Sequence, residues 1–153
     1  MKKKVIVRGP ALSRSGYGEH TRFILRALRS REDILDIYLY NLNWGKTGWL
    51  WEENKERDWL EGILEKTVFY TQQGGKFDVS MQITIPNEWE NLAPINIGVT
   101  AGMETNKISP TWIEKSQVVD HIITISEHSK SGFTNTSYQA KNNATGEVIN
   151  DFR

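Results

Sequence analysis

Two glycines near the start of the chain stand where backbone groups are readily offered to a ligand. The segment Ser15-Gly16-Tyr17-Gly18 follows a short apolar run and opens a helical pattern. Glycine lets the backbone approach a bound group closely, and the positive end of the following helix favours an anion such as a phosphate. The competing interpretation is a Gly/Ser turn that binds nothing.

Two familiar nucleotide-binding motifs are not completed in this sequence. Thr21 stands at the third glycine position of a dinucleotide fingerprint, and the second expected strand ends in Asn41 without a ribose-binding carboxylate. Residues 45–47 imitate the end of a phosphate-binding P-loop, but Tyr40 occupies the place of its first glycine. We therefore expect neither a nicotinamide-dependent reductase nor a P-loop enzyme.

Three further polar side chains follow expected strands. Glu104 and Thr105 come after the strand at residues 95–99, and Ser126 ends the strand at residues 120–125. Glu104 could bond ligand hydroxyls, cap a helix or pair with an arginine, and the sequence leaves these alternatives open. The Ser126 hydroxyl either touches a ligand or, more simply, caps its own helix.

Tryptophans form a second candidate feature. Four of the six fall within sixteen positions, at Trp44, Trp49, Trp51 and Trp59. An indole can pack on the apolar side of a pyranose ring while its N–H bonds a hydroxyl, but tryptophan more often supplies core area. We expect a structural role for Trp59, and leave both roles open for Trp44 and Trp49, which lie in an expected loop.

Composition excludes several classes of chemistry. The chain has no cysteine, and its three histidines (His20, His121 and His128) show no metal-ligand spacing, so we expect no metal and no cofactor. Nineteen basic residues balance nineteen acidic ones, which argues against a nucleic-acid partner. No stretch approaches the roughly 20 apolar residues of a membrane span. These features predict a cytoplasmic protein, and they identify no catalytic residue.

Strand and helix patterns alternate along the chain. The expected strands cover residues 4–8, 36–40, 77–83, 95–99 and 120–125. The expected helices cover residues 19–30 and 52–66, and two more begin at Ser109-Pro110 and at Ser126. This order predicts an α/β fold, a Rossmann-like parallel sheet with helices on both faces and ligands at the carboxyl ends of its strands.

Details of this pattern give more specific expectations. On the first helix, apolar positions at Ile24 and Leu28 place Arg22 on the outer side. The strand at 120–125 is the most continuous apolar run, so we expect it, with His121, to be buried. A domain over residues 1–135 would then precede a polar segment at 136–153 that lacks a closing element.

The order of several short motifs resembles the N-terminal half of family 4 (group 1) glycosyltransferases. The matching positions are Ser15, Gly16, Tyr17, Gly18, Arg22, Leu28, Glu104, Thr105, Pro110, Trp112, Asp120, Ile122, Ser126, Lys130 and Phe133. The resemblance spans about residues 5–133, and its strength comes from several weak matches that fall in order.

The resemblance implies a GT-B architecture, in which two Rossmann-like domains face each other across a cleft. The N-terminal domain receives the acceptor and the C-terminal domain binds the nucleotide-sugar donor. The loop at Gly16, Tyr17 and Gly18 would approach the donor diphosphate, and Glu104 with Thr105 would border the acceptor pocket. It also implies sugar transfer with retention of configuration and without a metal.

The resemblance covers less than half of such an enzyme, because the donor-side basic pair and glutamates normally lie in the second domain. We therefore expect the acceptor-binding half of a hexosyltransferase-like enzyme, inactive until a complementary C-terminal domain or subunit completes it. The alternative is a non-catalytic α/β sugar- or phosphate-binding module, for which Trp44 and Trp49 should matter more than Gly16.

Overall fold

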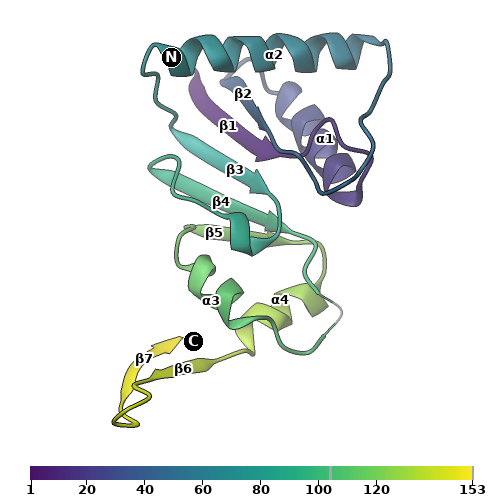
Figure 1. Cartoon of the computed structure of the whole chain (residues 1–153). Coiled ribbons are helices and arrows are strands. Elements are labelled where there is room, and N and C mark those ends of the chain that lie inside the picture. Colours follow the sequence, from purple (N-terminus) through teal and green to yellow (C-terminus); the bar gives the residue numbers. More distant parts are fainter. Residues whose placement is uncertain (104, 153) are drawn as a thin grey trace.

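The structure, a computed structural model, describes residues 1–103 and 105–152 and confirms the α/β prediction. A five-stranded parallel sheet has helices packed around it (Figure 1). The elements are β1 (Lys3–Gly9), α1 (Gly16–Arg29), β2 (Leu35–Asn41), α2 (Lys55–Gln72), β3 (Val79–Ile83), the 3-10 helix η1 (Pro86–Glu88), β4 (Ile95–Thr100), α3 (Pro110–Ser116), β5 (His121–Thr124), α4 (Glu127–Thr134), β6 (Tyr138–Lys141) and β7 (Val148–Phe152).

The strand order of the main sheet is β2-β1-β3-β4-β5. The chain moves outward from β1 to β2, then crosses back over β1 and continues in the opposite direction through β3, β4 and β5. This reversal makes the carboxyl ends of β1 and β3 the topological switch point, where ligands of open parallel sheets are usually bound.

One face of the sheet packs against α1 and holds most of the apolar core. Val7, Leu39 and Leu25 are at most 1% exposed. The expected outer position of Arg22 is wrong: its side chain is buried, like that of Leu25 on the same side of α1. The buried side of α1 therefore includes Gly18, which lies close to the backbone of Pro10 and Ser13 in the loop after β1.

An irregular segment, residues 84–94, covers the other face through hydrogen bonds to polar side chains of the strands. The Gln82 amide exchanges two hydrogen bonds with the backbone of Glu90, at 2.6 and 2.9 Å. The side-chain amide oxygen Oδ1 of Asn96 accepts from the N–H groups of Leu92 and Ala93. These bonds satisfy the backbone of a segment that makes few of its own.

Helix α2 runs along the outer edge of β2 (Figure 1). The Leu39 N–H of that edge strand donates to the Thr67 hydroxyl at 2.9 Å, and the same hydroxyl donates to Ile63 O. An edge that would otherwise offer unpaired backbone groups is thereby covered.

Strand β5 lies at the opposite edge, and the expectation that it is the most buried strand is wrong. His121 is exposed, Ile123 is 46% exposed, and Ile125, just after the strand, is 63% exposed. Among the described strands, β4 alone pairs with β5, so the apolar character of β5 was not enough to bury it.

The C-terminal segment contains elements that the sequence pattern did not predict. Strands β6 and β7 pair in antiparallel fashion as a separate hairpin that projects from the body (Figure 1). The Tyr138 hydroxyl joins it to the domain by donating to Ile108 O at 2.8 Å. Among the described residues, no helix is both long enough and apolar enough to cross a membrane.

Candidate functional site

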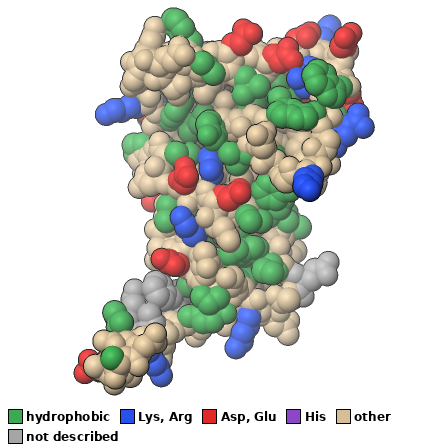
Figure 2. Space-filling view, in the orientation of Figure 1, with side chains coloured by type: hydrophobic (Ala, Val, Ile, Leu, Met, Phe, Trp, Pro, Cys, Tyr) green, Lys and Arg blue, Asp and Glu red, His purple; other side chains and the backbone are tan. Residues whose placement is uncertain are grey.

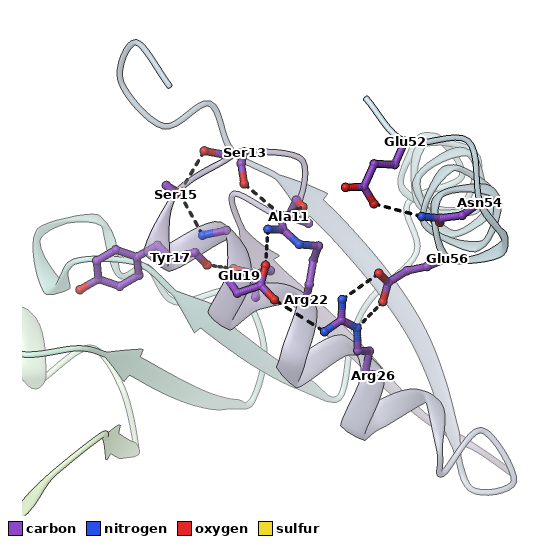
Figure 3. A network of polar contacts seen from close by, with 12 residues as sticks. Ala11, Ser13, Ser15, Tyr17, Glu19, Arg22, Arg26, Glu52, Asn54 and Glu56 are labelled. Atoms are coloured by element: carbon purple, nitrogen blue, oxygen red, sulfur yellow. Dashed lines mark hydrogen bonds and ion pairs between the residues drawn. The ribbon is translucent and has the colours of Figure 1, made fainter. Parts of the chain in front are cut away.

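Arg22 organises the loop at the carboxyl end of β1. Its guanidinium donates to Ala11 O at 2.7 Å and to Ser13 O at 2.9 Å, and it pairs with the Glu19 carboxylate at 2.7 Å (Figure 3). Only 4% of Arg22 is exposed. A buried arginine with these acceptors fixes the course of residues 10–15, a role that the sequence pattern missed by placing Arg22 outside.

The two glycines of the loop have different roles. The Gly18 N–H already donates to the Ser15 hydroxyl at 3.0 Å, the N-cap bond of α1. A Cβ on Gly18 would meet the carbonyl oxygens of Ser13 and Pro10, whereas a Cβ on Gly16 would meet nothing within 4 Å. Gly18 therefore permits close packing, and only Gly16 lies in open space.

The first turn of α1 keeps two N–H groups, those of Gly16 and Tyr17, without an acceptor among the described residues. Gly16 lines a shallow surface hollow with charges of both signs, including Arg14, Glu19 and Glu52. The positive end of the helix is thus partly offset by carboxylates.

Carboxylates near α1 are also paired with arginines. The Arg26 guanidinium of α1 donates to both Glu56 oxygens of α2, at 2.5 and 2.9 Å (Figure 3). These hydrogen bonds hold the pKa of the Glu56 carboxyl below its usual range. The pair joins the two helices beside the hollow.

Tyr17 links α1 to the end of β4. Its hydroxyl is 3.0 Å from the Thr100 hydroxyl and accepts from the Ala101 N–H at 3.3 Å. Its ring packs against Trp44, with centroids 4.8 Å apart. Tyr17 therefore supports the wall of a neighbouring cavity.

That cavity, of about 250 Å³, lies at the carboxyl edge between the loops after β1 and β2. It will be called the tryptophan cavity, and its lining residues are Leu12, Ser13, Asn41, Leu42, Asn43, Trp44, Gly45, Thr47, Gly48 and Trp49. Backbone bonds from Arg14 N to Gly48 O and from Leu50 N to Leu12 O, both 2.8 Å, hold the loops together.

Polar groups inside the tryptophan cavity are already oriented. The hydroxyls of Ser13 and Thr47 lie 2.6 Å apart, and the side-chain amide oxygen Oδ1 of Asn41 accepts from the Leu12 N–H at 3.1 Å. Sequence reasoning considered Asn41 only as a missing carboxylate. A polar residue at the carboxyl end of a parallel strand was the signal that would have identified it.

Neither Thr105 nor Ser126 lines this cavity. Glu104 is outside the described residues, so its predicted role stays a prediction. The Thr105 hydroxyl is exposed and donates to Lys107 O at 2.7 Å. The Ser126 hydroxyl caps α4 by accepting from Ser129 N at 3.1 Å, which confirms the simpler of its two interpretations.

Ser126 is nevertheless connected to Tyr17 through a chain of hydrogen bonds. Its hydroxyl is 3.0 Å from that of Ser129, which donates to Ala101 O at 2.9 Å. The Ala101 N–H in turn donates to Tyr17. The loop after β4 is therefore held from both sides.

Comparison with protein-family models, with curated proteins and with solved structures found no match. Within the described residues, no group of three or more His, Cys, Asp or Glu side chains is arranged to hold a metal ion. The assignment of function therefore depends on the geometry of the carboxyl edge and on the motifs in the sequence.

Proposed function

We propose that this chain is the acceptor-side domain of a glycosyltransferase of GT-B architecture and binds a hydroxyl-rich acceptor in the tryptophan cavity. The observation that carries the proposal is a cavity at the carboxyl edge of a doubly wound sheet, lined by two indoles and four other hydrogen-bonding side chains. This is the edge at which such sheets bind ligands.

The lining has the chemistry that a sugar requires. The indoles of Trp44 and Trp49 offer apolar area for one side of a pyranose ring, and their N–H groups can bond hydroxyls. Ser13, Asn41 and Thr47 offer donors and acceptors for the other hydroxyls. Tyr17, packed on Trp44, orients one of the indoles before the acceptor arrives.

The donor would be a nucleotide-sugar held by a complementary C-terminal domain or subunit. In that arrangement, the two N–H groups of Gly16 and Tyr17 are available to its diphosphate, where backbone donors would stabilise the negative charge of the leaving group. Gly18 does not offer its N–H, because the Ser15 cap uses it. The domain supplies acceptor binding and positioning, and the chain alone should not consume nucleotide-sugars.

Acceptor binding is tested by titrating the labelled protein with a panel of methyl pyranosides and disaccharides while indole N–H resonances are followed by NMR. We expect saturable shifts of the Trp44 and Trp49 signals, and at least about tenfold weaker binding in Trp49→Ala. Trp51→Ala is the matched control, because Trp51 is 77% exposed and does not line the cavity. Equal losses in both variants, or no saturable sugar binding, would contradict the proposal.

A second candidate is a non-catalytic carbohydrate-binding module. One observation favours it: the tryptophan cavity is lined by Trp44 and Trp49 and not by residues 16–18. Both functions predict sugar binding, so the discriminating experiment concerns transfer.

Transfer is tested by supplying the donor-binding domain of a family 4 glycosyltransferase in trans and following radiolabelled sugar. The transferase hypothesis predicts that Gly16→Val abolishes transfer without unfolding the domain, since a side chain there meets nothing in this structure. Gly18→Val is unsuitable, because it would clash with backbone carbonyls. Sugar binding without any transfer would favour the module.

A further inference from the structure

A second cavity, of about 340 Å³, lies away from the carboxyl-edge loops, between α2 and the segment that covers the sheet. It will be called the arginine cavity, and its lining residues are Ile6, Arg8, Tyr40, Thr67, Thr71, Phe77, Glu90 and Leu92. It shares no residue with the tryptophan cavity, and its volume falls in the range of small-molecule sites, roughly 300–1,000 Å³.

Arg8 is the one basic residue in this lining. It lies near the carboxyl end of β1, in register with Tyr40 of β2 and Gln82 of β3, and its side chain is only 10% exposed. A guanidinium carries five N–H donors, and burial of its charge is costly unless they are satisfied. Within the described residues, its one hydrogen bond goes from Nη1 to Glu88 O.

The nearest carboxylate is poorly placed to neutralise this charge. Glu90 approaches Arg8 only to 3.7 Å, beyond hydrogen-bond distance, and its side chain is 56% exposed. The backbone of Glu90 is held independently by the Gln82 amide. The Glu90 side chain can therefore swing into solvent without disturbing the segment, which leaves the guanidinium to another anion.

The remaining walls are apolar. Ile6, Phe77 and Leu92 contribute hydrocarbon, and the ring of Tyr40 lies 5.8 Å from the guanidinium. The hydroxyls of Thr67 and Thr71 already donate to carbonyls of their own helix. Figure 2 shows the side of the molecule on which η1 lies, where basic and acidic side chains lie near one another and hydrophobic side chains are also exposed.

We propose that the arginine cavity binds a small organic monocarboxylate, with its carboxylate on Arg8 and an aromatic or branched aliphatic body against Ile6, Phe77 and Leu92. A planar guanidinium matches a carboxylate through two parallel N–H···O bonds. One buried cation in apolar walls suits a single negative charge and a hydrophobic body. The site is separate from the acceptor site and does not depend on the proposed transferase function.

The test uses benzoate, phenylacetate and 4-methylpentanoate as probes, each against its neutral amide, with binding measured by calorimetry and ligand-observed NMR. We expect at least one carboxylate to bind with 1:1 stoichiometry and at least about tenfold more tightly than its amide, since a charge-assisted bond is lost in the amide. Equal binding of acid and amide, or no saturable binding of any probe, would overturn the proposal.

Variants at the two sides of the cavity sharpen the test. Glu90→Gln removes the competing carboxylate and should tighten carboxylate binding about three- to tenfold. Leu92→Trp should fill the cavity and abolish carboxylate binding, whereas Trp49→Ala in the tryptophan cavity should leave carboxylate binding unchanged.

Arg8→Met should weaken carboxylate binding at least about tenfold if circular dichroism shows that the variant folds. Weaker binding in Glu90→Gln would overturn the proposed competition, whether or not the Arg8 variant folds.

Discussion

The two ends of the main sheet carry similar side chains in very different surroundings. At β1 and β2, Val7 and Leu39 are buried beneath α1, whereas Ile95 of β4 and Ile123 of β5 are each 46% exposed. Ile123 is in register with the buried Val99, so it points to the same side of the sheet as the core. We call the part of the sheet formed by β1 and β2 the covered half, and the part formed by β4 and β5 the open half.

This difference shows that burial was decided by the elements that cross each strand. The covered half has α1 on one face, α2 along its edge, and Arg22 tying the loop to the helix. The open half has no helix over Ile95 and Ile123 within the described residues. The free energy of folding should therefore be concentrated in the covered half.

The largest expected effect is that of a cavity in the covered half. Leu25→Ala should lower the free energy of unfolding by about 3 kcal/mol, because Leu25 is 1% exposed and packs against both strands. Ile123→Ala, the matched change in the open half, should cost about 1 kcal/mol or less. Urea denaturation of both variants measures the comparison, and equal losses would contradict it.

A smaller effect is expected where α1 meets the loop after β1. Gly18→Ala should destabilise the domain by about 2 kcal/mol, because its Cβ would press on backbone carbonyls that cannot move freely. Gly16→Ala should change stability by no more than about 0.5 kcal/mol. Thermal unfolding of the two variants distinguishes a packing glycine from an unconstrained one, and similar melting temperatures would refute the distinction.

The covered edge of β2 should depend on one hydroxyl. Thr67→Val leaves the Leu39 N–H without its acceptor and should cost about 1–2 kcal/mol. Thr71→Val, one turn later, removes only a bond to the backbone of its own helix and should cost roughly 0.5 kcal/mol or less. Hydrogen exchange of the Leu39 N–H gives the local readout. Unchanged protection of this group in Thr67→Val would show that the hydroxyl does not stabilise the edge of β2.

The smallest effect concerns pH. Burial lowers the pKa of His20, which is half-buried on α1 one turn after Tyr17. The folded state therefore disfavours the charged imidazole, and its contribution to stability is present above about pH 6.5 and is lost as the pH falls through that value. His20→Gln should flatten this part of the stability profile, as measured by urea denaturation at a series of pH values. An unchanged profile in His20→Gln would contradict the prediction.

Much of the fold was predictable from local patterns. Each strand of the main sheet lies where an apolar run ends at glycine, proline or a polar loop, and Ser15 and Ser126 cap the helices that follow them. Such signals are local, because periodicity and capping depend on residues within a few positions of one another. The hairpin at 138–152 was missed because its strands, of four and five residues, are too short for a clear pattern and lie in a stretch rich in Asn, Thr, Lys and Gly.

The sites were predictable only in part. The sequence pointed to the carboxyl edge and to Trp44 and Trp49, since both follow from strand order and residue type. It gave no sign that Arg22 is inside, because an arginine on a helix is usually solvated and only its carbonyl acceptors, 9 and 11 positions away, make burial favourable.

The amino-acid sequence by itself determined the alternating strands and helices and the parallel sheet. Only the tertiary structure decided which strands are covered, and that Gly18 is closely packed while Gly16 is not. It also decided that Arg8 lines a cavity with the Glu90 carboxylate 3.7 Å away. The physical reason is that secondary structure follows from neighbours along the chain. Burial and charge pairing depend on groups that only the fold brings together.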